Sequence, residues 1–270
     1  MKQSYLNDEI ISIAKKIYKI DLSGYKPSFI DRRLKLIAMR KGIFSARQFK
    51  DLIINSGEFN HYLEEEIPVH VTSLFRDHDF FNSLINQITY QYNKSGILKI
   101  WHPGCSDGSE VYSMAMLLES RMNHIDFKLL GTDISHESIL TARSGSLNCK
   151  NLHEVQSLFR ASGGKGSVRE HVISSANSFV IRQRLYDKIR FSRHVLGSDS
   201  KFTKFDVIIC RNMLMYYNDK AKEKIMKDLY DSLHTGGILA IGKQESIHDL
   251  EITSKLQVLD KKNKIYKKLE

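Results

Sequence analysis

The chain has 270 residues, of which 41% are hydrophobic, 27% are charged and only 3 are prolines, a composition typical of a folded globular protein. This length allows one large α/β domain and a small companion domain. The net charge of +10 suggests an acidic partner, which can be a nucleic acid, a membrane surface or an acidic protein.

The sequence shows no pattern typical of a membrane-spanning helix, a signal peptide, a disulfide framework or a zinc site. No apolar run approaches the roughly 20 residues that a membrane-spanning helix needs, and the start, MKQSYLNDEI, has acidic residues where a signal peptide needs an apolar core. We therefore expect a cytoplasmic protein without membrane insertion. Cys105, Cys149 and Cys210 have neither CxxC spacing nor a histidine partner at metal-ligand spacing, so we expect reduced thiols and no metal site.

Residues 1–65 are predicted to form a small helical domain. The isoleucines of NDEIISIAKKIYKI recur at helical spacing. A second helix is expected to begin near Ser28 or Phe29 and to stop at Gly42, and a third is expected in SARQFKDLIIN. The second helix is rich in basic residues, which can form either a docking face or an ordinary solvated face.

Residues 66–96 are predicted to link this domain to the rest of the chain. They contain IPVHVTSLFRDHDFF, whose phenylalanines could simply hold the two domains together. Arg76 could simply pair with a neighbouring carboxylate. In isolation, this stretch does not indicate a function.

From residue 97 to residue 270, apolar runs alternate with helical patterns. The predicted strands are ILKIW, FKLLGTD, KIRFSRH, FDVIIC and GGILAIG, and the predicted helices are SEVYSMAMLLESR, SHESILTARSG and NDKAKEKIMKDLYDSLHTGG. This alternation predicts an α/β fold with a doubly wound, mostly parallel sheet. A small β-subdomain could lie within residues 148–178.

Ligands of such sheets bind beyond the carboxyl ends of the strands, where strand order reverses. The first strand is followed by HPGCSDGSE, which matches neither the GxGxxG fingerprint nor a P-loop. Asp133, after the second strand, can accept from two ribose hydroxyls or can cap the next helix. Arg211 and Asn212 leave the fourth strand, and such polar groups need partners if they are buried.

These motifs in this order resemble the CheR-type chemoreceptor glutamate methyltransferases. The resemblance is carried by VTSLFRDHDFF, GCSDGSEVYSMAM, GTDIS, FDVIICRNMLMYY and, more loosely, GKQES, and GYKPSFIDRRL extends it over nearly the whole chain. It implies a Rossmann-like domain that uses S-adenosyl-L-methionine and releases S-adenosyl-L-homocysteine. It further implies glutamyl methyl ester formation on the cytoplasmic helical region of methyl-accepting chemotaxis receptors, and we expect a monomer.

The resemblance also implies roles for individual residues. Tyr216 would lie near the transferred methyl. On chemical grounds, we expect Arg76 to orient the receptor carboxylate with its forked donors and the Tyr216 hydroxyl to fix one of its oxygens. The cofactor pocket would be formed by His70, Thr72, Arg76, Gly104, Glu110, Asp133, Val195, Leu196, Arg211 and Asn212. The receptor would dock on the basic second helix through Arg32, Arg33 and Arg40.

The chain departs from the family pattern at three positions. His70 replaces a common asparagine, Ser109 precedes Glu110 where many members have two acids, and Val195 replaces the asparagine of an Asn-Leu pair. These departures leave open a second class of function, a non-catalytic adaptor that binds S-adenosyl-L-methionine or S-adenosyl-L-homocysteine.

A nucleic-acid methyltransferase is the other alternative. The basic charge alone supports it, because the chain has no Asn/Asp-Pro-Pro-aromatic motif after the fourth strand and no basic stretch interleaved with aromatic residues. We therefore expect no nucleic-acid partner.

Overall fold

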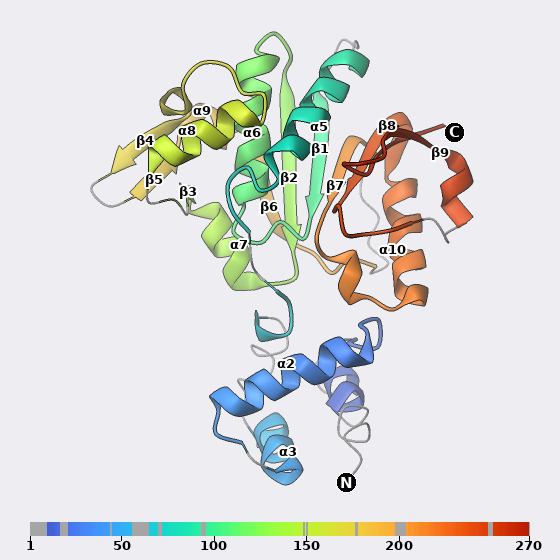
Figure 1. The fold of residues 1–270 in the computed structure, drawn as a ribbon. Helices are drawn as coiled ribbons and strands as arrows, with labels where there is room; N and C mark the ends of the chain where they lie inside the picture. The colour runs from blue at the N-terminus through green and yellow to red at the C-terminus, as the bar shows by residue number, and fades with distance from the viewer. Residues whose placement is uncertain are drawn as a thin grey trace. The chain divides into compact units, whose positions relative to one another are not determined.

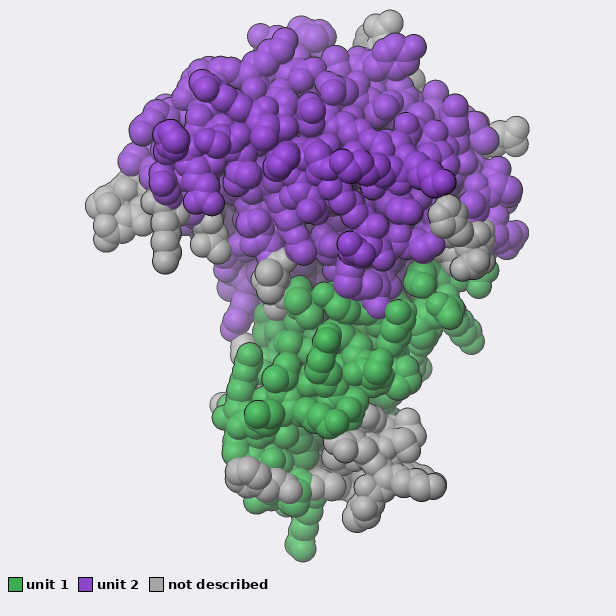
Figure 2. All heavy atoms as spheres, in the orientation of Figure 1, with its two compact units in different colours: residues 1–69, 216–224 green, residues 70–215, 225–270 purple. Residues whose placement is uncertain are grey.

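The computed structural model describes residues 10–16, 21–43, 45–55, 65–69, 72–92, 96–147, 149, 151–175, 178–197, 204–247 and 251–269. The chain divides into two compact units (Figure 2): unit 1 contains residues 1–69 and 216–224, and unit 2 contains residues 70–215 and 225–270. A short return of the chain, residues 216–224, therefore belongs with the N-terminal helices.

Unit 1 is built from helices. Residues 10–16 are helical, and they are followed by α2 (Pro27–Arg40) and α3 (Ala46–Asn55). Pro27 suits the first turn of α2 because its fixed φ is already helical. Gly42, with φ 63°, follows the C-terminal end of α2, in the left-handed region that glycine adopts without strain.

The core of unit 1 lies along one face of α2. Four side chains spaced three or four residues apart are buried there: Phe29, Ile30, Leu34 and Ile37. Residues 216–218 join unit 1 through an antiparallel bridge between Tyr25 and Tyr217 and a hydrogen bond from Asn218 Nδ2 to the Ser23 carbonyl at 2.7 Å.

Unit 2 contains a seven-stranded sheet with the order β6-β2-β1-β7-β8-β10-β9. Its strands are β1 (Leu98–Pro103), β2 (Phe127–Asp133), β6 (Ile189–Arg193), β7 (Phe205–Cys210), β8 (Leu233–Ile241), β9 (Leu256–Asp260) and β10 (Ile265–Lys268). Five of these strands run parallel to one another: β1, β2, β6, β7 and β8. β10 is antiparallel to both of its neighbours, β8 and β9. Strand order reverses at the β1/β7 boundary, which confirms the doubly wound fold.

The helices of unit 2 accompany this sheet (Figure 1). They are α5 (His78–Gln91), α6 (Ser109–Arg121), α7 (His136–Arg143), α8 (Leu152–Ala161), α9 (Gln183–Tyr186) and α10 (Asp219–Asp231, which begins in unit 1), with short 3-10 turns η2 (Val168–Glu170), η3 (Leu214–Tyr216) and η4 (Glu251–Lys255). A separate antiparallel sheet has the order β3-β5-β4, with β3 (Ser146–Leu147), β4 (Val172–Ser175) and β5 (Ser178–Ile181).

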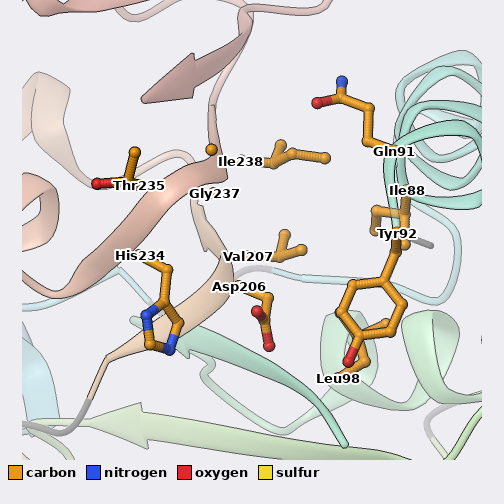
Figure 3. A pocket seen from close by; sticks show the side chains of 11 residues that line it. Ile88, Gln91, Tyr92, Leu98, Asp206, Val207, His234, Thr235, Gly237 and Ile238 are labelled. Atoms are coloured by element: carbon orange, nitrogen blue, oxygen red, sulfur yellow. The ribbon is translucent and has the colours of Figure 1, made fainter. Parts of the chain in front are cut away.

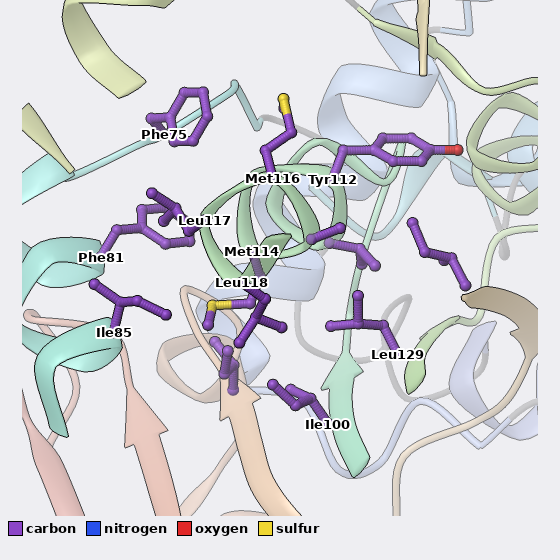
Figure 4. Packing of buried hydrophobic residues seen from close by; sticks show 14 of the residues in the cluster. Phe75, Phe81, Ile85, Ile100, Tyr112, Met114, Met116, Leu117, Leu118 and Leu129 are labelled. Atoms are coloured by element: carbon purple, nitrogen blue, oxygen red, sulfur yellow. The ribbon is translucent and has the colours of Figure 1, made fainter. Parts of the chain in front are cut away.

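One large hydrophobic core joins α5 and α6 to one face of the sheet. Phe81 and Ile85 of α5 pack with Leu117 of α6 and with Ile100 and Leu129 of the strands (Figure 4). Alternate strand residues such as Trp101, Ile208 and Leu239 are also buried but lie outside this cluster. Both faces of the sheet are therefore covered, as a parallel sheet requires.

Two sequence predictions differ from the observed elements. Residues 78–91 belong to the predicted linker, whereas in the structure they form the helix α5, which has five buried side chains. The predicted helix through Gly237 is wrong at its end, because α10 stops at Asp231 and Leu233 already pairs with Phe205 in the sheet. Gly236, with φ 78°, lies in the irregular start of β8, which hides the strand pattern.

Candidate cofactor site

The candidate site lies at the switch point of the sheet, beyond the carboxyl ends of β1, β2 and β7. The turn after β1 and the loop after β7 approach closely there. A Cβ atom on Gly104 would lie 2.8 Å from Met213 Sδ, and Gly104 has φ 71°. The left-handed backbone favours glycine at this position, because any other residue there is strained whatever the space.

The turn that carries Arg76 precedes α5. Phe75 and Asp77, on either side of Arg76, both have left-handed backbones, with φ of 54° and 61°. The Phe75 N–H donates to Ser113 Oγ of α6 at 2.8 Å, and the Phe75 ring is buried. Arg76 is therefore presented from a turn whose backbone other parts of unit 2 hold in place, and its side chain is half-buried.

Arg211 is a buried charged group of the site, with its side chain 1% exposed. Its Nη1 donates to Glu110 Oε2 at 2.9 Å, and its Nη2 contacts Asp77 Oδ2 at 2.5 Å. The guanidinium also lies 4.0 Å from the centre of the Phe80 ring. Its Nε is buried and has no hydrogen-bond partner among the described residues. Three chain segments thus meet at one cation.

Glu110 is the second residue of α6, where the helix dipole favours a negative charge. Its Oε1 lies 3.1 Å from Nδ1 of the fully buried His102, and Oε2 accepts from Arg211. Burial by itself would raise the pKa of Glu110, but the contacts with His102 and Arg211 outweigh burial and hold this pKa below its ordinary value.

Asp133 ends β2 and is 7% exposed. Its two carboxylate oxygens accept from the backbone N–H groups of Ser106 at 2.8 Å and Ser135 at 3.0 Å. The N-cap of α7 is Ser135, whose Oγ accepts from the Ser138 N–H. The alternative reading of Asp133 as the N-cap is therefore wrong, and its oxygens keep lone pairs for a further donor.

The structure brings most of the sequence-predicted site residues together in unit 2. The His194 N–H donates to the Asp133 carbonyl at 2.9 Å, which places Val195 and Leu196 just beyond Asp133. Val195 is 46% exposed, and Thr72 begins the described part of the Arg76 turn. His70 lies outside the described residues.

Tyr216, Arg32, Arg33 and Arg40 belong to unit 1. The Tyr216 ring stacks on Phe29 at 4.6 Å. Arg33 differs from the other two arginines, because its Nε donates to the Glu66 carbonyl at 2.7 Å, so its guanidinium holds the chain that follows the helices.

Three polar residues of the site were not singled out from the sequence: Asp77, His102 and Glu245. Asp77 contacts Arg211, and His102 contacts Glu110. Glu245 accepts a hydrogen bond from the backbone of the loop after β7. One signal was available: an arginine that leaves a buried strand needs carboxylate partners, and Asp77 lies in the same motif as Arg76.

A pocket elsewhere in unit 2 is separate from this site (Figure 3). It is lined by the end of α5 and by the first residues of β1, β7 and β8, including Tyr92, Asp206 and His234. These are the amino ends of the strands, whereas the predicted residues lie at the carboxyl ends.

The described residues contain no group of three or more His, Cys, Asp or Glu side chains that could hold a metal ion. None of their helices combines the length and hydrophobicity that crossing a bilayer requires.

The lowered pKa of Glu110 predicts a pH-dependent contribution to stability. Ionised Glu110 stabilises the folded protein above the ordinary pKa of 4.5, and this contribution is lost as the pH falls through the lower folded-state value. The difference in unfolding free energy between wild type and Glu110→Gln should therefore shrink between about pH 7 and about pH 3. Urea unfolding at several pH values measures it, and a difference that stays constant would contradict the prediction. Glu251→Gln, at an exposed glutamate, is the control.

Comparison with known proteins places the chain in a family. The family model described as CheR methyltransferase, SAM binding domain, matches residues 70–265. A chemotaxis protein methyltransferase of Listeria monocytogenes is 28% identical over 238 residues, covering 87% of this chain and 87% of that protein. Another, of Borreliella burgdorferi, is 27% identical over 261 residues, covering 89% of this chain and 88% of that protein.

Among solved structures, the S-adenosyl-L-methionine-bound amino pentose methyltransferase CalS10 of Micromonospora echinaspora aligns with a TM-score of 0.39 at 11% identity. The alignment covers 67% of this chain and 56% of that chain. Because the family model matches most of the chain, the protein belongs to the CheR methyltransferase family, and its cofactor is S-adenosyl-L-methionine.

Proposed function

We propose that this methyltransferase transfers methyl groups to glutamate side chains of chemotaxis receptors and forms glutamyl methyl esters. The observation that carries the proposal is the arginine turn beside the cofactor site: Arg76 stands between two left-handed residues, on a turn joined to Arg211 through Asp77. A half-buried guanidinium at this place suits a carboxylate substrate, because its forked donors match the two oxygens. The names of the Listeria and Borreliella relatives support the chemotaxis setting.

The residues of the site fit the cofactor by their chemistry. Glu110 offers an ionised carboxylate to the ammonium of the cofactor's amino-acid end, and the buried Arg211 Nε offers a donor to its carboxylate. Asp133 offers acceptor sites to the ribose hydroxyls. The roles of Thr72, Gly104, Val195, Leu196 and Asn212 in this pocket follow from the resemblance. All except Thr72 also lie just after strands of the sheet.

Methyl transfer to a carboxylate needs no general acid–base catalysis. The cofactor supplies a methyl group on a positively charged sulfur, which the receptor carboxylate accepts. A glutamate with an ordinary pKa of about 4.3 is already ionised at neutral pH, so no general base is needed. Arg76 would align the carboxylate and replace part of its water. The role of the Tyr216 hydroxyl in fixing a carboxylate oxygen stays a prediction.

Methyl transfer to native receptors tests this function. With radiolabelled S-adenosyl-L-methionine, wild type should give base-labile label on receptor membranes. Arg76→Ala should lower the rate by roughly 100-fold, the size of effect that mispositioning produces, while Arg160→Ala, at an exposed arginine of α8, should leave it unchanged.

The two possible failures of this assay differ. Cofactor binding by the wild type without any transfer would favour the non-catalytic adaptor. Full activity of Arg76→Ala would instead remove only the role of Arg76.

We further propose that α2 docks the receptor. Five of its exposed residues combine positive charge with two apolar side chains: Arg32, Lys35, Leu36, Met39 and Arg40. Met39 is 76% exposed, and Lys35 and Arg40 each pair with one carboxylate, Asp31 and Glu66. This surface suits an acidic amphipathic helix.

Reversing two of these charges tests the docking surface. The double variant Arg32→Glu, Arg40→Glu should raise the KM for receptor about tenfold and flatten its dependence on salt, with kcat little changed. Arg33 is left intact because it holds the Glu66 carbonyl. Lys255→Glu with Lys261→Glu changes the net charge equally at exposed positions and serves as control. An equal rise of KM in both double variants would contradict docking on α2.

A further inference from the structure

Glu245 is a buried carboxylate in the turn that follows β8. It is 4% exposed, and its oxygens accept from the backbone N–H groups of Gly242 at 2.7 Å, Leu214 at 2.6 Å and Asn212 at 3.2 Å. The N–H of Met215 also bonds to it. One side chain therefore collects the backbone donors of two loops, which leave the neighbouring parallel strands β7 and β8.

The backbone of the loop after β7 requires hydrogen bonds that hold its conformation. Asn212 has φ 61°, a left-handed backbone that a residue other than glycine rarely adopts without support. A Cβ atom on Gly242 would lie 2.9 Å from the Asn212 nitrogen and 2.7 Å from Glu245 Oε2. The two loops therefore leave no room for a side chain at position 242, and the Glu245 carboxylate lies between their N–H donors.

The hydrogen-bond geometry favours an ionised Glu245, whereas burial works against the charge. Burial is the larger effect and raises the pKa of Glu245 above its ordinary value, and the converging N–H donors limit that rise without cancelling it. An ionised carboxylate offers two acceptor oxygens to these donors, and an amide of the same shape offers only one.

We propose that Glu245 is a positioning residue of the cofactor site: its carboxylate fixes the backbone of residues 211–215, so that Arg211 and Asn212 meet S-adenosyl-L-methionine in the correct geometry. The loop begins at Arg211, whose guanidinium reaches Glu110 and Asp77. Glu245 acts through this loop and not on the methyl group. The proposal concerns cofactor affinity, so it stands independently of the methylated substrate.

Calorimetric titration with S-adenosyl-L-methionine tests the role of Glu245. Glu245→Gln keeps the size of the side chain but turns one acceptor into an NH2 group that faces backbone donors. We expect this variant to bind the cofactor about tenfold more weakly, the size of effect that loss of a charge-assisted hydrogen bond produces. Glu251→Gln, at an exposed glutamate, should bind as wild type does.

A double-mutant cycle separates positioning from general destabilisation. In an Asn212→Ala background, Glu245→Gln should weaken binding by less than about threefold, because the Asn212 side chain that Glu245 positions for the cofactor is already absent. Unchanged affinity of Glu245→Gln, or the full loss in both backgrounds, would overturn the proposal. Thermal unfolding without cofactor identifies folded variants, and Glu245→Asp replaces Glu245→Gln in the same cycle if the latter does not fold.

Discussion

The ion-pair cluster around Arg211 is the interaction on which the candidate site depends. The guanidinium is almost fully buried and contacts Glu110 at the start of α6 and Asp77 before α5. Removing one partner from a buried ion pair costs about 3–5 kcal/mol, whereas a folded domain is stable by only about 5–15 kcal/mol. The loop after β7, the helix after β1 and the turn before α5 therefore hold one another in a single arrangement.

Backbone strain is concentrated at the same place. Among the described residues, five other than glycine have positive φ, and four of them surround the site: Phe75, Asp77, Ser106 and Asn212. Each such residue costs on the order of 1–3 kcal/mol, so the surrounding structure must hold it. Side chains of other segments do so: Ser113 binds the N–H of Phe75, Asp133 that of Ser106, Glu245 that of Asn212, and Arg211 binds the Asp77 carboxylate.

This arrangement explains why the site uses many hydrogen bonds from side chain to backbone. The polar groups of the candidate site are positioned by loops, and loops lack the repeated hydrogen bonds of helices and strands. Buried carboxylates such as Asp133 and Glu245 supply those bonds instead. Protein groups therefore hold these loops, and loops held in this way lower the entropic cost of binding a ligand.

The sequence predicted the parts that local patterns determine. The bounds of α6, β2 and β7 follow directly from their apolar spacing, and Asp133 and Arg211 follow from their places after strands. The partners of Arg211 could not be read in this way, because Asp77 and Glu110 lie 134 and 101 residues away along the chain. The helix α5 was missed because its phenylalanines were interpreted as a contact between domains, although Phe80 and Phe81 fill the core of unit 2.

Cofactor binding by Arg211→Lys tests the central claim most directly, because lysine keeps the charge but lacks the fork that reaches both Glu110 and Asp77. Calorimetric titration with S-adenosyl-L-methionine should give an affinity at least about tenfold lower than that of wild type, and the unfolding temperature should be lower as well. Arg160→Lys, at an exposed arginine, should change neither quantity. Wild-type affinity and unfolding temperature in Arg211→Lys would contradict the claim that this cluster assembles the site.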